Sequence, residues 1–200
     1  MFFASLSLAA APVAAACPTA ADLDTTGVWI DFSDGSYVHY QRLGPEMVGE
    51  ANHHPDGVES FFTKRFRGVW LTEDMPLIGD GWNPEEAVTF APSPGEADWP
   101  PAGPELNWSG KVVTRDAGGV VINSFDMAAW TVGAERIHIS GCDYAADVIR
   151  IEEIYEDGDQ ATEIRYLSEL GVAYVAAAGP LGVDYEIHAA PTWIGIEAPR

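Results

Sequence analysis

Hydrophobic and polar residues alternate along most of the chain after residue 26, and turn residues separate the alternating runs. Alternation with a period of two is typical of a β-strand whose two faces meet different environments. Clear examples are residues 27–32, 36–41 and 147–155, and Asp34-Gly35 and Asp157-Gly158 follow two of them as hairpin signals. Such runs recur roughly every eight to twelve residues, without a sustained helical period. The pattern predicts an all-β fold, an antiparallel β-meander that forms a barrel, a half-barrel or a sandwich.

Two further stretches are predicted to turn. Gly133-Ala134 separates two alternating runs, 128–132 and 135–140, so we expect a tight turn there. The stretch 53–57 reads His-His-Pro-Asp-Gly, in which proline presets φ and glycine accepts a positive φ. Both turns would connect neighbouring antiparallel strands.

The segment 79–110 differs in composition from the rest. It holds six prolines and three tryptophans but no lysine or arginine. So much proline is incompatible with a central strand, although residues 87–90 fit a short strand. The segment is therefore an irregular flap across the sheet or a linker between two β halves. We favour the flap, because the apolar area of three indole rings needs cover.

The first 21 residues carry no charged side chain. An apolar run at 2–8 and an alanine-rich run up to residue 16 predict a secretory signal peptide at 1–16 and a single β-rich domain at 17–200. The basic region that normally opens such a signal is missing, so we expect the true start codon to lie upstream. The protein is predicted to be periplasmic or secreted.

The chain contains two cysteines, Cys17 and Cys142. In an exported protein an even count favours a disulfide, and this one would close a loop of well over a hundred residues. One alternative is a lipid anchor through Cys17, although Ala14 stands where a lipobox has leucine. The other is a pair of free thiols in a cytoplasmic protein.

Charge excludes two classes of partner. The chain has 31 acidic and 10 basic residues, a net charge of −21, which repels nucleic acids and anionic membrane surfaces alike. Lys64, Arg65 and Arg67 form the densest basic cluster. It could serve an anionic ligand or an acidic partner, but we favour pairing with the abundant carboxylates of the protein itself.

Catalytic and metal-binding signatures are weak. The chain lacks the serine-elbow, zinc-protease, C-x-x-C, phosphate-loop and dinucleotide motifs. His53, His54 and Asp56 are metal-type ligands, but adjacent histidines in a turn usually point apart and spacing marks no further ligand, so we predict no metal site there. The loop 80–86 offers Asp80, Asn83, Glu85 and Glu86, and it is the stretch where calcium would be best accommodated. We predict a protein that is not an enzyme and needs no cofactor.

The leading hypothesis is an exported non-enzymatic binding or structural protein whose curved sheet holds an apolar ligand, such as an acyl chain. One alternative is an interaction module whose aromatic surface docks another envelope protein. A third is a hydrolase that uses carboxylates or a loop-bound metal. The candidate ligand-binding residues are the tryptophans and two of the clustered arginines: Trp70, Trp82, Trp99, Trp108, Arg65 and Arg67.

Overall fold

The computed structural model describes residues 16–55, 60–78, 81–95, 97–183 and 186–198, and these are almost entirely β-structure. Two 3-10 helices of one turn accompany the strands: η1 Asp22–Asp24 and η2 Pro84–Glu86. The strands are β1 Val28–Phe32, β2 Tyr37–Gly44, β3 Met47–His53, β4 Phe61–Phe66, β5 Trp70–Ile78, β6 Gly81–Trp82, β7 Val88–Pro92, β8 Asn107–Arg115, β9 Val121–Ile139, β10 Cys142–Ile154, β11 Gln160–Leu167, β12 Val172–Pro180, β13 Glu186–Ile187 and β14 Pro191–Gly195.

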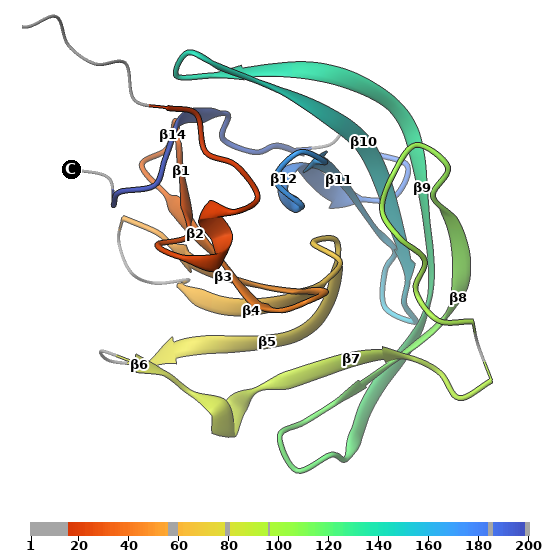
Figure 1. Cartoon of the computed structure of the whole chain (residues 1–200). Helices are drawn as coiled ribbons and strands as arrows, with labels where there is room; N and C mark the ends of the chain where they lie inside the picture. Colours follow the sequence, from red (N-terminus) through yellow and green to blue (C-terminus); the bar gives the residue numbers. More distant parts are fainter. Residues whose placement is uncertain (1–15, 56–59, 79–80, 96, 184–185, 199–200) are drawn as a thin grey trace, which may run out of the picture.

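The strands form one antiparallel sheet that confirms the predicted all-β meander. Its order is β13-β12-β11-β10-β9-β8-β7-β5-β4-β3-β2-β1-β14, with β6 paired to β5 outside this path. Almost every pair is therefore consecutive in sequence, as in a meander (Figure 1). Two pairs are exceptions: β5 pairs with β7, and β14 returns to pair with β1 at the edge opposite β13. The chain between β13 and β14 thus runs from one edge of the sheet to the other.

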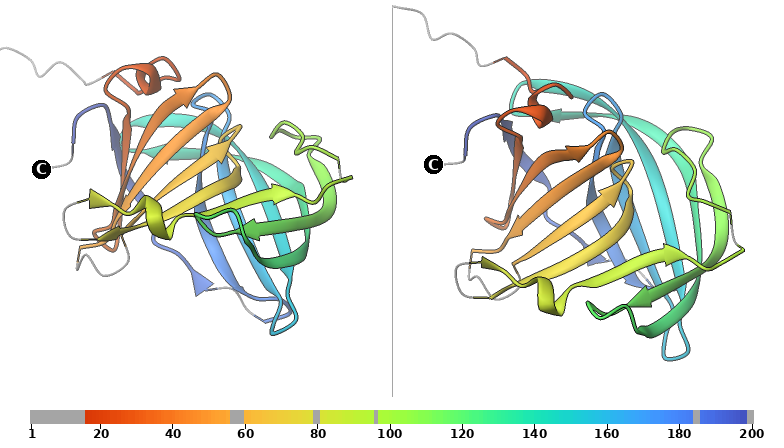
Figure 2. Two further views of the ribbon diagram at one scale, coloured as in Figure 1. Left: turned by 90° about the horizontal axis from the view of Figure 1, so that it is seen from below. Right: turned by 60° about the horizontal axis from the view of Figure 1, so that its bottom comes forward.

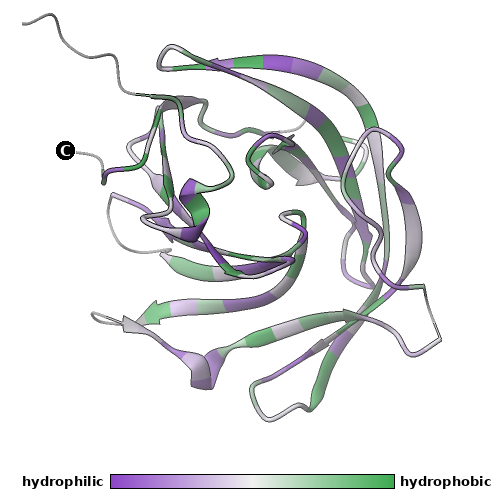
Figure 3. Ribbon diagram, viewed as in Figure 1, coloured by the Kyte–Doolittle hydropathy of each residue, from purple (hydrophilic) through white to green (hydrophobic). Residues whose placement is uncertain are grey.

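The sheet curls until its two halves face each other (Figure 2). The hydroxyl of Tyr40, on β2, donates a hydrogen bond of 2.9 Å to the carbonyl oxygen of Ala173, on β12. Two clusters of buried side chains fill the space, one between β1–β3 and β10–β12 and one among β5 and β8–β12. Hydrophobic and hydrophilic residues alternate along the long strands β9 and β10 (Figure 3), which gives each strand one face for this interior.

One glycine permits a close approach between two turns of the sheet. Gly68, between β4 and β5, has φ +71°, and a Cβ there would lie 2.1 Å from the carbonyl oxygen of Gly171 in the β11–β12 turn. Any side chain would collide with backbone, so only glycine fits this contact.

The prediction of a turn at Gly133-Ala134 is wrong. β9 runs through it without interruption and pairs with β10 on both sides of a register shift: Val148 is opposite Gly133, whereas Ile149 is opposite Thr131. Val132 is the extra residue, as in a β-bulge, which bends a strand without ending it. The predicted turn at 53–57 also begins too early, because His53 is the last residue of β3; residues 56 and 57 lie outside the described residues.

The segment 79–110 contains more strand than its prolines suggest, since β6, β7 and the start of β8 belong to it. Four side-chain donors of the described residues hold the irregular part, from 93 to 106, and one of them is Trp108 Nε1, which donates to the carbonyl of Ala97 (3.3 Å). Trp70 Nε1 donates to the carbonyl of Pro100 (2.7 Å), Arg67 Nη1 to that of Trp99 (3.1 Å) and Thr131 Oγ1 to that of Gly103 (2.6 Å). These bonds hold the segment against the second buried cluster.

The predicted disulfide between Cys17 and Cys142 is present, with 5.6 Å between the two Cα atoms. It joins the N-terminal segment to β10, and the hydroxyl of Tyr144 adds a 3.1 Å hydrogen bond to the carbonyl of Pro18. The lipid anchor through Cys17 is thereby contradicted, because its sulfur is already bonded. Disulfides of this kind are typical of exported and envelope proteins.

Neither of the two single-turn helices among the described residues is long enough to cross a membrane.

Candidate functional site

The inside of the curled sheet contains a cavity of about 210 Å³, here called the apolar cavity. Eleven of its fourteen lining residues are apolar, and the other three are Arg65, Glu153 and Thr162. Its walls come from β4, β5 and β7 on one side and from β8–β12 on the other. The larger apolar side chains around it are Trp70, Phe90, Trp99, Phe125, Met127 and Ile151.

Three tryptophans pack together at this cavity. The rings of Trp99 and Trp70 are stacked, with centroids 5.6 Å apart and an interplanar angle of 3°. Trp108 meets Trp70 edge to face, with centroids also 5.6 Å apart. The indole Nε1 of Trp99 is buried and has no hydrogen-bond partner among the described residues. An unpaired buried donor costs about 1–3 kcal/mol.

The structure separates the six candidate residues into two groups. Trp70, Trp99 and Arg65 line the apolar cavity, and Trp108 packs behind Trp70 in the same cluster. Trp82 and Arg67 do not line it. Trp82 lies on the outer face, and Arg67 pairs with Glu46 at the β4–β5 turn.

A second cavity of about 300 Å³ adjoins the first, here called the polar cavity. It lies between the inner side of β2–β4 and strand β12, and His188 from the chain between β13 and β14 contributes to its lining. Arg65 and Val175 line both cavities, so they form the boundary between them.

A row of polar side chains crosses the inner face beside these cavities. Tyr40, Glu50, Thr63 and Asp74 are direct partners on the successive strands β2, β3, β4 and β5. Because cross-strand partners project to the same face, the four side chains lie next to one another. Sequence reasoning missed this row, although the alternation Val48, Glu50, Asn52 places Glu50 on the same face as a buried valine.

Glu50 is 3% exposed and is the most deeply buried carboxylate of the row. Its Oε2 accepts hydrogen bonds from Thr63 Oγ1 (3.0 Å) and Arg65 Nε (2.9 Å). Its Oε1 is buried and has no partner among the described residues, and the same holds for Asp74 Oδ1. Arg65 also donates from Nη1 to the carbonyl of Val69 (3.0 Å).

Burial controls the titration of this region. It raises the pKa of the Glu50 carboxyl above its usual value, although the Arg65 guanidinium opposes the change. Burial also raises the pKa of Asp74 and of Glu153. The pKa of the Tyr40 hydroxyl lies well above its usual value for the same reason, reinforced by the negative charge of Glu50.

These shifts predict that the protein is more stable in mild acid than at neutral pH. A carboxyl whose pKa is raised on folding binds its proton more tightly in the folded state. Its stabilising contribution is complete below the unfolded pKa, near 4, and disappears as the pH rises through the folded pKa. Asp74→Asn should therefore make the free energy of unfolding, measured in urea at pH 4.5, 6 and 7.5, fall less steeply with pH.

Asp143→Asn is the matched control for that prediction, since it removes the same charge. A hydrogen bond from His138 lowers the pKa of Asp143, so this carboxyl stabilises above its unfolded pKa and its removal should act in the opposite direction. Equal pH profiles for the two variants would contradict the assignment of the buried row.

The basic cluster pairs with carboxylates of the protein itself, as predicted. Lys64 Nζ lies 2.8 Å from Glu73 Oε2, and Arg67 Nε lies 2.8 Å from Glu46 Oε1. Arg65 completes the set through Glu50. The partners come from β3, β5 and the turn before β3, not from segment 79–110.

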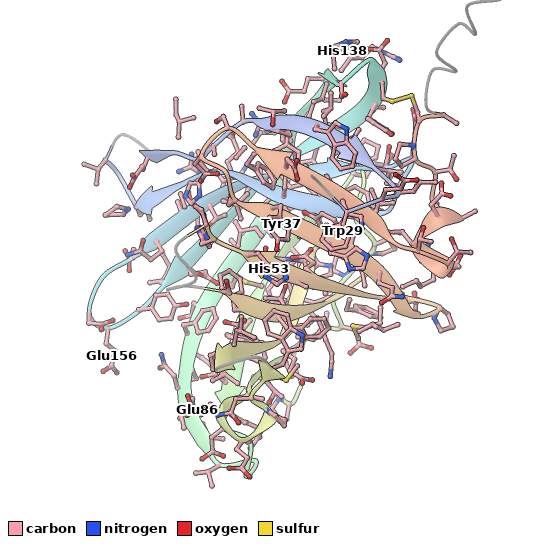
Figure 4. The ribbon with its side chains drawn as sticks, turned by 90° about the vertical axis from the view of Figure 1, so that its left-hand side faces the viewer. Trp29, Tyr37, His53, Glu86, His138 and Glu156 are labelled. Carbon is pink, nitrogen blue, oxygen red and sulfur yellow. A yellow bond between two sulfur atoms is a disulfide. The ribbon has the colours of Figure 1, made fainter. Side chains whose placement is uncertain are left out.

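A ladder of aromatic rings covers the outer face of β1–β4 and continues onto β6. Its ring pairs have centroid distances between 4.0 and 5.8 Å. Figure 4 shows Trp29, Tyr37 and His53 together on this face. Its members are Trp29, Tyr37, His39, His53, Phe62 and Trp82.

Within the described residues, no group of three or more histidine, cysteine, aspartate or glutamate side chains has a metal-binding arrangement. Of the proposed calcium loop, Asp80 lies outside the described residues. The side chain of Asn83 accepts a hydrogen bond from the Glu85 backbone and so caps η2. Glu85 and Glu86 are exposed.

Comparison with known proteins gives little beyond the geometry. No family model matches the chain, and no curated protein matches it. Among solved structures it is similar to the hypothetical lipoprotein YmcC from Escherichia coli, with 11% identity and a TM-score of 0.41 over 76% of this chain and 77% of that one.

Proposed function

We propose that this protein is an exported, non-enzymatic binding protein that holds an apolar ligand, such as an acyl chain, in the apolar cavity. We place it in the periplasm or outside the cell. The observation that carries the proposal is the tryptophan-walled cavity inside the curled sheet. An engineered apolar cavity of about 150 Å³ is enough to bind benzene, so the 210 Å³ here can accommodate part of a small apolar molecule.

Two features favour a ligand over simple packing. Protein interiors are close-packed, so a space of this size beside fully buried Trp70 is unusual unless something occupies it. The lining of the apolar cavity also includes Arg65 and Thr162, whose side chains carry hydrogen-bond donors for an acyl chain that ends in a carbonyl group.

The test is binding of N-phenyl-1-naphthylamine, a neutral apolar dye whose fluorescence rises in apolar surroundings. We expect the purified protein to bind it with one-to-one stoichiometry. Ile151→Trp, which adds volume to the cavity wall, should weaken binding at least tenfold. Ile154→Trp is the matched control, since residue 154 is on the same strand but 40% exposed, and it should leave the affinity unchanged.

Trp82→Ala provides a second control, because Trp82 lies on the outer face and should not affect the dye. Native mass spectrometry of gently purified protein offers a readout that needs no variant, and we expect co-purified lipid. Dye binding that is equal in the Ile151 and Ile154 variants would contradict the proposal. So would a clean apo mass together with no dye binding.

A further inference from the structure

The polar cavity has two features that differ from those of the apolar cavity. It contains a buried carboxylate with one unused oxygen, and several of its walls are aromatic rings. Glu50 lines it with a side chain only 5% exposed, and its Oε1 has no partner among the described residues. A buried acceptor left without a partner costs free energy, so the polar cavity favours an occupant that donates a hydrogen bond.

Aromatic side chains from four strands line this cavity together with Glu50. Phe32 comes from β1, Tyr40 from β2, Phe61 from β4 and Tyr174 from β12. The rings of Phe32 and Tyr174 are 5.8 Å apart and meet edge to face. Ring faces attract organic cations, most strongly where the contact is desolvated.

Charge also favours a cation over an anion. Among the described residues, Arg65 is the one guanidinium that lines the polar cavity, and it already donates to Glu50 Oε2 and to the Val69 carbonyl. Asp34 adds a second carboxylate to the lining, and the whole protein carries −21. A protein with this field attracts cations and repels carboxylates and phosphates.

We propose that the polar cavity is a binding site for an organic ammonium ion, in which Glu50 Oε1 accepts a hydrogen bond from the ligand's amine and the surrounding rings contact its positive charge. One buried carboxylate beside a set of rings suits an amine better than a metal ion, which needs three or more ligands. The described residues contain no such set. This site is distinct from the apolar cavity and does not depend on a ligand there.

The experiment compares three probes of nearly equal shape and different charge: 2-phenylethylamine, 2-phenylethanol and 3-phenylpropionate. Binding is measured by isothermal titration calorimetry with the full chain at pH 8, where His53, whose pKa is lowered by burial, is neutral. We expect the amine to bind at least tenfold tighter than the alcohol and the carboxylate to bind weakest. Equal affinities, or no binding of the amine, would overturn the proposal.

Glu50→Gln isolates the role of the carboxylate. It should weaken binding of the amine at least tenfold and change the alcohol by less than threefold. Glu156→Gln makes the same charge change at an exposed residue at the edge of the molecule and should leave both affinities unchanged (Figure 4). An amine affinity that falls equally in both variants would mean a general charge effect and would overturn the proposal.

A third variant keeps the test decisive if Glu50→Gln does not fold. Phe61→Leu removes one ring but keeps the carboxylate and an apolar side chain. Because a leucine cannot make a cation–π contact, the amine should bind at least threefold more weakly while the alcohol changes little. A parallel loss for both probes would show that the rings act only as apolar surface and would overturn the role given to them.

Discussion

Removal of the Cys17–Cys142 disulfide should lower the free energy of unfolding by about 4–5 kcal/mol, the chain-entropy value for a closed loop of 125 residues. The cross-link limits the unfolded chain over more than half its length, so its loss increases the entropy of the unfolded state. The double variant Cys17→Ser/Cys142→Ser is compared with the oxidised protein by urea unfolding. Such a loss is a large share of the stability of a domain of this size.

The reduced protein should nevertheless remain folded in the absence of denaturant. Leu23 is completely buried in the first core cluster, and Arg42 forms an ion pair with Asp24, so the N-terminal segment keeps contacts of its own. Wild-type protein in excess dithiothreitol is the control and should match the double variant. A difference below about 1 kcal/mol in both samples would contradict the loop-closure argument.

Trp70→Ala should destabilise the protein by about 3–5 kcal/mol, the usual cost of truncating a large buried aromatic side chain. Trp70 is 1% exposed, stacks on Trp99 and donates a hydrogen bond to the carbonyl of Pro100. The substitution therefore leaves a larger cavity and releases one of the bonds that hold segment 93–106. Urea unfolding measures the first effect, and limited proteolysis within 93–106 measures the second.

Trp82→Ala is the matched substitution on the outer face. Its ring is only partly buried and contacts the rings of His53 and Phe62, and such pairs contribute about 0.5–1.5 kcal/mol. We expect a loss of about 1 kcal/mol and no new cleavage site within 93–106. If the two variants lost equal stability, Trp70 would not be the central residue of the interior.

The candidate site was predictable only in part. The tryptophan content of segment 79–110 indicated an apolar surface that needs cover, and Trp99 and Trp108 do lie in the interior. Trp82 does not, because β6 pairs with the end of β5 and brings its ring to the outer face beside Phe62. No local pattern distinguishes these tryptophans, since the face that each one occupies depends on which strand its neighbours join.

Local sequence patterns were sufficient to predict the all-β class, the disulfide and the pairing of the basic cluster with carboxylates of the same chain. Period-two alternation, an even cysteine count and a threefold excess of carboxylates over basic residues can be read from the chain without knowing which strands pair. Tertiary structure decided where the sequence signals were ambiguous. β9 continues past Gly133 because β10 pairs with the residues before and after it, and Glu50 is buried because β12 closes over a face that a single hairpin would leave in water. Both outcomes depend on contacts between residues far apart in sequence, and the two cavities arise from the same curvature.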